Sequence, residues 1–358
     1  MTSKPAGVMR GLVVNDPHTS DQSPLGRLPT YRDDIAAKLR EAAEITRKEK
    51  LDLTIFTGDI FHQKRQNLVS HGLVQENADI LRSFYGDRKG ILGNHDLSFE
   101  GAASVPTQPI GTLAKTGAVD ILLEDVIIKY NGLAVMLSPV VWTPDQDSDV
   151  ENFQLGPESL LLAKDADFVI RIAHGGIVPP DWGDVPFDIV QVDKIDLTGI
   201  DLLLSGHLHP DYGVFDIHQG KHVCYFANLG SLSRVSRTPD QLERETIRML
   251  GFTISGPHQV EFTEYVLSSV KPAAEVFYQM TKGADEAPME LEDFAQRLAE
   301  FVVEEDDIER LLHDAERSGV SPEVMRIVLQ RLEEAGYVPS GYSDKAEAAT
   351  DEGEGDPD

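Results

Sequence analysis

The sequence has very little cysteine, a deficit of positive charge and no long apolar run. Cys224 is the only cysteine among the 358 residues, so the chain cannot form an internal disulfide, and a reducing compartment is the simplest setting. No segment is long and apolar enough to span a membrane. The opening residues, MTSKPAGVMRGLVV, lack the apolar core and small-residue cleavage site of a secretory signal peptide. We therefore expect a cytoplasmic protein that does not bind a membrane.

The deficit of positive charge is concentrated toward the C-terminus. The formal net charge is −29, and residues 284–358, with 23 acidic and 6 basic side chains, contribute −17 of it. Because contacts with nucleic-acid phosphates need Lys and Arg, this balance disfavours tight non-specific binding of nucleic acid by the chain alone. It leaves open a locally positive surface, a metal ion that binds phosphate, or a basic partner.

Predicted strands alternate with predicted helices over residues 8–267, which is typical of a layered α/β domain. Apolar residues at helical spacing predict helices over 31–50 and 67–84. Two antiparallel hairpins are predicted, at residues 119–141 and 246–267. Further strands are predicted at residues 7–16, 51–59, 90–96, 168–176, 199–209 and 222–231.

The chain beyond this domain divides by composition. Residues 268–288 are predicted to be a linker, and apolar residues at helical spacing then predict a helical extension over 289–338. Within it, Ser321 is a good N-cap with Pro322 at the first helical position. Residues 339–358 are acidic, lack large aliphatic side chains and are predicted to be a disordered tail.

Side chains able to bind metal follow the predicted strands. They are Asp16, His18, Asp59, Asn94, His95, His174, His207 and His209. In layered α/β sheets, sites form at the carboxyl ends of the strands, so residues far apart in the sequence converge there. A lone histidine at a strand end is more often structural, but several short polar motifs, each with Gly or Pro at the turn, are hard to reach by chance.

The mixture of imidazole, carboxylate and amide donors indicates the kind of metal. These donors suit Mn, Fe, Zn or Co better than Mg or Ca, and the absence of thiolates disfavours a structural zinc site. Two such ions with a water or hydroxide between them serve in-line attack on phosphorus, because they generate the nucleophile and neutralise charge on the phosphate oxygens. Phosphoester hydrolysis is therefore the predicted chemistry.

The motifs also resemble a known family. In this order, DPH, GDIFH, GNHD, AHGG and GHLH resemble the motif series of the calcineurin-like metallophosphoesterase superfamily. NLGS resembles the Asn-Pro-Gly-Ser segment near the end of that fold, with Leu229 in place of proline. The resemblance covers about residues 8–267, and it implies a four-layer α/β/β/α sandwich.

The resemblance also implies roles for these residues by position. One metal ion would be bound by Asp16, His18, Asp59 and His209. The other would be bound by Asp59, Asn94, His174 and His207, so that Asp59 bridges the two. His95 would be the acid that protonates the leaving oxygen, and Asp96 would orient His95. Mn²⁺ is the expected ion at both positions, with Fe, Zn, Co or Ni as alternatives.

Other polar residues give weaker signals. His62, in GDIFH, matches a histidine of the double-strand-break repair nucleases, and a role beside the metal ligands or with substrate is weighed evenly against a structural role. For the basic residues near the motifs, a solvated loop is preferred over phosphate binding. These residues are Lys64, Arg65, Arg234 and Arg237. The histidines outside the motifs are interpreted as surface or core residues.

The fold does not name the substrate. One hypothesis is a DNA nuclease resembling the SbcD type, whose helical extension would dock a partner ATPase or a second copy of the chain. The alternative for this extension is that its apolar faces pack on the catalytic domain. The alternative is a small-molecule enzyme acting on cyclic nucleotides, including 2′,3′-cyclic ones, or on phosphomonoesters. A non-catalytic scaffold is disfavoured because the ligand set and His95 are intact. A protein phosphatase is disfavoured because the sequence shows no extended basic or regulatory segment of the kind associated with that branch.

Overall fold

The computed structural model describes residues 7–24, 26–63, 68–98, 101–180, 182 and 188–278. The chain divides into two compact units, Met1–Gln279 and Met280–Asp358. The predicted helical extension, the acidic tail and residues 279–288 of the predicted linker lie outside the described residues, so those predictions and the domain boundaries stay predictions. No helix in the described ranges has the length and apolar character needed to cross a membrane, and the cytoplasmic location stays a prediction.

Two six-stranded mixed sheets form the centre of the described unit. The first sheet has the strand order β14-β13-β1-β2-β3-β4. In it β1 to β4 run parallel, β13 pairs antiparallel with β1, and β14 pairs antiparallel with β13. Its strands are β1 (Met9–Val14), β2 (Leu53–Phe56), β3 (Asp87–Gly90), β4 (Asp120–Ile121), β13 (Arg248–Gly256) and β14 (Gln259–Val266).

The second sheet has the order β11-β12-β10-β7-β6-β5. Its four central strands are parallel, and β5 and β11 run antiparallel at the edges. Its strands are β5 (Val126–Tyr130), β6 (Leu133–Pro139), β7 (Phe168–Gly175), β10 (Leu202–His207), β11 (Gly213–Gln219) and β12 (His222–Asn228). A small parallel pair, β8 (Ile177–Val178) and β9 (Val190–Gln191), follows β7 in the chain.

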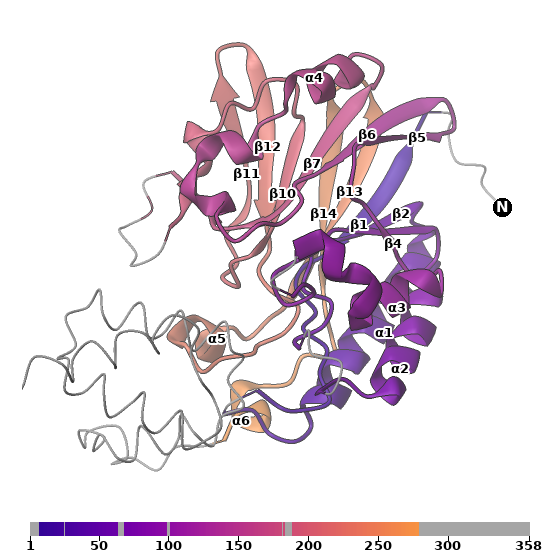
Figure 1. Cartoon of the computed structure of the whole chain (residues 1–358), viewed down its shortest axis with the longest axis vertical. Helices are drawn as coiled ribbons and strands as arrows, with labels where there is room; N and C mark the ends of the chain where they lie inside the picture. The colour runs from indigo at the N-terminus through magenta and orange to yellow at the C-terminus, as the bar shows by residue number, and fades with distance from the viewer. Residues whose placement is uncertain are drawn as a thin grey trace, which may run out of the picture. The chain divides into compact units, whose positions relative to one another are not determined.

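Helices cover the outer faces of the sheets. Figure 1 shows α1, α2 and α3 grouped beside β1, β2 and β4, and α4 apart from them beside the second sheet. The helices are α1 (Tyr31–Glu49), α2 (His71–Arg82), α3 (Pro109–Lys115), α4 (Pro157–Ala163), α5 (Pro239–Glu243) and α6 (Ala273–Val276). The hydroxyl of Ser70 accepts a hydrogen bond from the Leu73 N–H at 3.1 Å, so it caps α2 and explains why that helix begins later than predicted.

Alternating side chains of the strands build three cores that separate four layers. In β1, Leu12 and Val14 pack with the α1–α3 helices, whereas Met9 and Val13 pack between the two sheets. In the second sheet Leu203 points to a third core under α4. This alternation is the period-two pattern of strands buried on both faces. The four-layer α/β/β/α sandwich predicted from the sequence is confirmed.

The secondary structure differs from the sequence-based prediction in several parts, of which the following lie nearest to the predicted motifs or helices. The strand predicted at residues 90–96 lies earlier, at Asp87–Gly90, and GNHD is a loop. The strand is polar at three of its four positions, so its apolar signal is weak, while the apolar residues after it are buried outside the sheet. The strand β11 and the helix α3 were not predicted.

The beginning of the predicted linker belongs to the fold. Val276 and Phe277 are buried, and the backbone of residues 276–278 bonds with Gly26 and Leu28. The Arg27 guanidinium donates to the Val276 carbonyl at 3.0 Å. The described part of the chain therefore packs on the domain as far as residue 278.

Candidate metal centre

The candidate ligands come together at the carboxyl ends of the parallel strands. Asp16 follows β1, Asp59 follows β2 and Asn94 follows β3. His174 and His207 lie at the ends of the neighbouring strands β7 and β10, where Gly206 pairs with His174 and His207 with Gly175. The two sheets thus supply one site, as expected for the layered α/β architecture.

Strained backbone marks the same positions. Asp16, His18, Asp59 and His207 have φ angles of 42°, 47°, 48° and 83°. A non-glycine residue with positive φ costs about 1–3 kcal/mol and persists only where the surroundings hold it. Such residues cluster at functional sites, so the backbone itself singles out four of the predicted ligands.

Glycines in two motifs allow the ligand loops to approach closely. A Cβ on Gly93, in GNHD, would lie 2.1 Å from Asp59 Oδ1. A Cβ on Gly206, in GHLH, would lie 2.6 Å from the Thr57 carbonyl oxygen and 2.9 Å from Asp16 Oδ1. Larger residues at either position would push the carboxylates away.

The first predicted set of ligands is brought together in part. His18 Nε2 lies 3.0 Å from His209 Nε2 and 3.5 Å from Asp59 Oδ2. Asp16, the fourth predicted member, instead turns Oδ1 toward the second set, where it lies 3.3 Å from His174 Nδ1 and accepts the His207 N–H at 3.1 Å. Its other oxygen, Oδ2, is buried and has no hydrogen-bond partner.

The second predicted set is compact. His174 Nε2 lies 3.1 Å from Asp59 Oδ2 and 3.1 Å from Asn94 Oδ1. His207 Nδ1 lies 3.1 Å from the same Asn94 oxygen. Asp59, His174 and His207 have ligand atoms within 4.8 Å of one another, so they form a group able to bind a metal ion.

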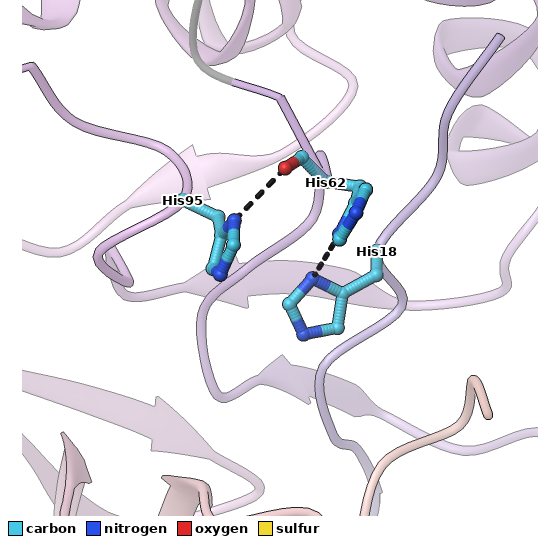
Figure 2. Close-up of side chains that lie close together, drawn as sticks. All are labelled: His18, His62 and His95. Carbon is cyan, nitrogen blue, oxygen red and sulfur yellow. Dashed lines mark hydrogen bonds between the residues drawn. The ribbon is translucent and has the colours of Figure 1, made fainter. Parts of the chain in front are cut away.

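His95 is placed beside this group. Its backbone N–H donates to Asp59 Oδ1 at 2.9 Å. Its ring atom Nδ1 lies 2.8 Å from the His62 carbonyl oxygen (Figure 2). A carbonyl oxygen only accepts, so Nδ1 carries a proton and Nε2 is the nitrogen that gains or loses one. The ring is half-buried, which leaves it accessible from solvent.

Asp96 does not take the predicted position against the His95 ring. Its carboxylate accepts from the backbone N–H groups of Ile60, Phe61 and Gly93 at 3.2–3.4 Å. Asp96 therefore ties the loop after β2 to the loop after β3, and the His62 carbonyl orients His95. The sequence pattern missed this because the orienting group is a backbone atom from another motif.

His62, left open by the sequence, lies in direct contact with the candidate ligands. Its Nδ1 is 3.4 Å from His18 Nδ1, and its ring stacks on that of His95 with centroids 5.2 Å apart (Figure 2). His18, His62 and His95 form a second group whose ligand atoms lie within 4.8 Å of one another. His18 is thus flanked by His209 at Nε2 and by His62 at Nδ1.

Several supporting residues were not singled out by the sequence. The Thr57 carbonyl lies 2.8 Å from His174 Nδ1, and Gln146 donates to the His174 carbonyl. The hydroxyls of Ser231 and Ser233 donate to the Asp16 carbonyl at 2.9 and 3.3 Å. Only Ser231 had a signal, since it ends the NLGS motif.

The basic residues have different positions from those expected. Arg234 is 1% exposed, and its guanidinium donates to the carbonyls of Arg244 and Lys271, so the preferred solvated-loop interpretation is wrong for it. Arg237 is half-buried. Lys64 and Arg65 lie outside the described residues.

The electrostatics of the site place the buried carboxylates of Asp16 and Asp59 against the positively charged ring of His174. Burial raises the pKa of Asp16 to about 7, against the opposing effect of His174 and with a further rise from Asp59. Burial alone would lower the pKa of His174, but the carboxylates of Asp59 and Asp16 raise it to about 10. Burial lowers the pKa of His207 to about 3 and that of His209 to about 4, so both rings are neutral.

This arrangement fits divalent cations. The Asp16 Oδ2 atom is a buried, unpartnered acceptor, and buried charges are normally paired or coordinate metals. Burial also holds the pKa of His18 well below its usual range, so His18 and His209 are neutral imidazoles facing each other through nitrogen. Neutral imidazole and carboxylate are the forms in which these side chains bind metal.

These donors, with Asp59 placed between two sets, define a class of site: a cluster of histidines and carboxylates able to bind metal ions. A family model described as calcineurin-like phosphoesterase matches residues 9–211, which is more than half of the chain. The chain therefore belongs to the calcineurin-like phosphoesterase family, as its motifs predicted. The match is to the family as a whole, and the SbcD-like branch stays a prediction.

Solved structures with similar folds share little sequence with this chain. NAD nucleotidase from Haemophilus influenzae is 12% identical with a TM-score of 0.44, and the match covers 73% of this chain and 50% of that one. The calcineurin-like phosphoesterase YfkN from Bacillus subtilis is 15% identical with a TM-score of 0.43, covering 77% and 94%. An archaeal phosphodiesterase is 13% identical with a TM-score of 0.34, covering 72% and 100%. These similarities carry no argument about substrate, and no curated protein matches the sequence.

Proposed function

We propose that the chain is a two-metal phosphodiesterase that hydrolyses nucleotide or nucleic-acid phosphodiesters. The observation that carries the proposal is the position of Asp59, whose Oδ2 lies 3.5 Å from His18 Nε2 and 3.1 Å from His174 Nε2. One carboxylate is thus shared by two sets of nitrogen donors. Two-metal hydrolases need such a shared ligand, because their ions act together on one phosphate.

The proposed ligands follow the two sets. Asp16, His18, Asp59 and His209 would hold one ion, and Asp59, Asn94, His174 and His207 the other. When bound, the ions would activate water for attack on phosphorus and neutralise charge on the phosphate oxygens. Mn²⁺ is the proposed ion, and Fe, Zn, Co and Ni suit the same donors.

His95 is the proposed general acid. Its Nδ1 proton is held by the His62 carbonyl at 2.8 Å, so proton transfer at this ring occurs at Nε2. Protonation of the leaving oxygen from Nε2 would prevent the build-up of an alkoxide. The stacked ring of His62 limits rotation of His95, which supports a positioning role for His62.

Asp96 is proposed as a positioning residue rather than as a direct partner of His95. By accepting the N–H groups of Ile60, Phe61 and Gly93, it fixes the two loops that carry Asp59 and Asn94. Its loss would therefore disturb the shared carboxylate and the second set of donors at once.

Two substrate classes remain within this proposal. We favour DNA, because GDIFH resembles the repair nucleases and because the predicted helical extension is suited to docking a partner ATPase or a second copy. The alternative within it is a 2′,3′-cyclic nucleotide, which a site with half-buried Asn94, His95 and His207 also admits. A phosphomonoesterase is the competing hypothesis outside the proposal.

The test is hydrolysis of several substrates side by side in Mn²⁺ by the full chain and by His95→Gln. The substrates are linear duplex DNA, single-stranded DNA, 2′,3′-cyclic AMP, an aryl phosphodiester and the matching aryl phosphomonoester. We expect His95→Gln to lower kcat on the preferred diester by about 10²–10⁴-fold, the usual contribution of a general acid. Bound metal, measured by elemental analysis, should remain unchanged.

A matched control is His218→Gln. His218 is 64% exposed on β11, and its described partner is Asp216 of the same strand, so its replacement should leave kcat unchanged. Faster turnover of the monoester than of every diester would contradict the phosphodiesterase proposal. Unchanged kcat in His95→Gln would remove His95 as the acid.

A further inference from the structure

Two aromatic rings, that of exposed Trp182 and that of half-buried Tyr212, lie on segments that follow the strands carrying proposed metal ligands. Trp182 is 40% exposed, and its ring meets that of Tyr212 edge to face, with centroids 4.8 Å apart and planes at 70°. The other tryptophan, Trp142, is half-buried and packs against the core under α1–α3. Packing in the core therefore accounts for Trp142 but not for the exposed ring of Trp182, and exposed apolar groups often mark binding surfaces.

The topology places this pair at the edge of the sheet that carries the site. Trp182 follows β7 and β8, and β7 carries His174; Tyr212 follows β10, which carries His207. Because β7 and β10 are adjacent and parallel, the loops that follow them leave the sheet at the same edge. Tyr212 is only three residues beyond His209.

Hydrogen bonds connect the described residues of both segments to the strand ends. The Val190 N–H donates to the Gly176 carbonyl at 2.8 Å, and Gln191 Nε2 donates to the Trp182 carbonyl at 3.4 Å. The Tyr212 N–H donates to the Asn228 carbonyl at 2.8 Å, and the Asn228 side chain donates to the Leu208 carbonyl at 3.0 Å. The aromatic pair is therefore tied to the segment that contains His207 and His209.

We propose that Trp182 and Tyr212 form a stacking surface for a nucleobase of the substrate. The inference rests on the proposed phosphodiesterase function and narrows its substrate to phosphodiesters that carry a base beside the scissile phosphate. Aromatic side chains bind bases of any sequence, because every base has a π-face. The phosphate would be held at the metal donors and the base at this pair, without requiring an excess of positive charge on the chain.

The experiment compares a base-bearing substrate with the same substrate lacking its bases. The full chain in Mn²⁺ is given thymidylyl-thymidine and an analogue in which both bases are replaced by hydrogen. Trp182→Ala and Tyr212→Ala should raise KM for the dinucleotide by roughly 10-fold, in line with base stacking, and leave kcat unchanged. KM for the base-free analogue should stay the same, and Trp182→Phe should restore most of the loss.

The matched control is Tyr85→Ala. Tyr85 is also an exposed aromatic, at 47%, but it precedes β3 and so lies at the opposite, amino end of the sheet. Its replacement should leave KM unchanged for both substrates. An equal change of KM for both substrates in Trp182→Ala, or no change for either, would overturn the stacking surface while leaving the phosphodiesterase proposal intact.

A binding measurement separates this inference from catalysis. Thymidine 5′-monophosphate should quench the tryptophan fluorescence of the full chain, and the quenching should be lost in Trp182→Phe, which retains Trp142. If neither substrate is hydrolysed but this quenching is seen, the phosphodiesterase proposal fails and the base-binding surface stands. Quenching that persists in Trp182→Phe would assign it to Trp142 and overturn the inference.

Discussion

The two sets of proposed metal donors differ in what holds them in place. His174 and His207 lie on adjacent parallel strands, and their positions are fixed by the hydrogen bonds of the sheet. His18 and His209 lie on loops beyond the strand ends. One set therefore shares the rigidity of the sheet, whereas the other depends on a few contacts between loops.

Those contacts converge on residues 229–233, which we call the tie segment. The Ser231 N–H donates to the His209 carbonyl at 3.1 Å, and its hydroxyl donates to the Asp16 carbonyl at 2.9 Å. The Leu232 N–H donates to the Asn15 carbonyl at 2.7 Å. The tie segment thus joins the loop of Asp16 and His18 to the loop of His209, and it does for the first set what the sheet does for the second.

The largest effect should come from Asp59→Asn, which removes the distinction between the two sets by weakening both. The substitution removes the negative charge of the shared carboxylate and so weakens the free energy of metal binding by several kcal/mol. Hydrolysis should therefore fall by about 10³-fold or more. Elemental analysis should show loss of both ions. Asp87→Asn, at the amino end of β3, is the matched control and should retain both; a variant at Asp59 that kept two ions would contradict the bridging role.

A comparison of His207→Ala with His209→Ala sharpens the difference between the sets. We expect the sheet-held set to bind its ion more tightly, because less ordering is needed on binding. In a Mn²⁺ titration, His207→Ala should weaken the tighter binding event by about 100-fold, at least as much as losing an outer partner of a ligand. His209→Ala should weaken only the weaker binding event, which belongs to the loop-held set. The reverse pattern would show that the loop-held set binds its ion first.

The sequence was sufficient to predict which side chains lie close together where the pattern is local. Gly-containing motifs after apolar runs indicated which side chains leave the strand ends, and the sheet order then brings Asp59, His174 and His207 within 4.8 Å of one another. The patterns predicted only a layered α/β domain, and the four layers were implied by the family resemblance; the structure shows how alternation within a strand such as β1 serves two cores.

The sequence was insufficient where the partner is a backbone atom or a distant residue. The orientation of His95 depends on the His62 carbonyl, and every residue has a carbonyl, so no side-chain pattern reveals it. Arg234 was interpreted as a solvated loop residue. Its side chain is instead buried, and its guanidinium donates to the carbonyls of Arg244 and Lys271. The polar strand β3 was misplaced because its pairing, and not its own apolar residues, keeps it in the sheet.

The smallest expected effect tests the tie segment itself through Arg244→Met. The Arg244 guanidinium donates to the carbonyls of Leu229 and Ser231 at 2.7 and 2.6 Å, so it clamps the segment without touching a proposed ligand side chain. Its loss should weaken the first, loop-held set by about 10–100-fold, the range seen when outer partners of ligands are removed. The affinity of the second set should not change.

Arg88→Met is the matched control, because Arg88 also donates to backbone carbonyls, those of Ala118 and Gly86, but at the amino end of β3. Both variants remove a guanidinium clamp, so both should lower the melting temperature, and only Arg244→Met should change metal affinity. Lys38 donates to the Leu232 carbonyl at 2.9 Å and offers a second clamp on the same segment. If Arg244→Met weakens both sets equally, the sheet does not isolate His174 and His207 from the loops, and the two sets form one cooperative site.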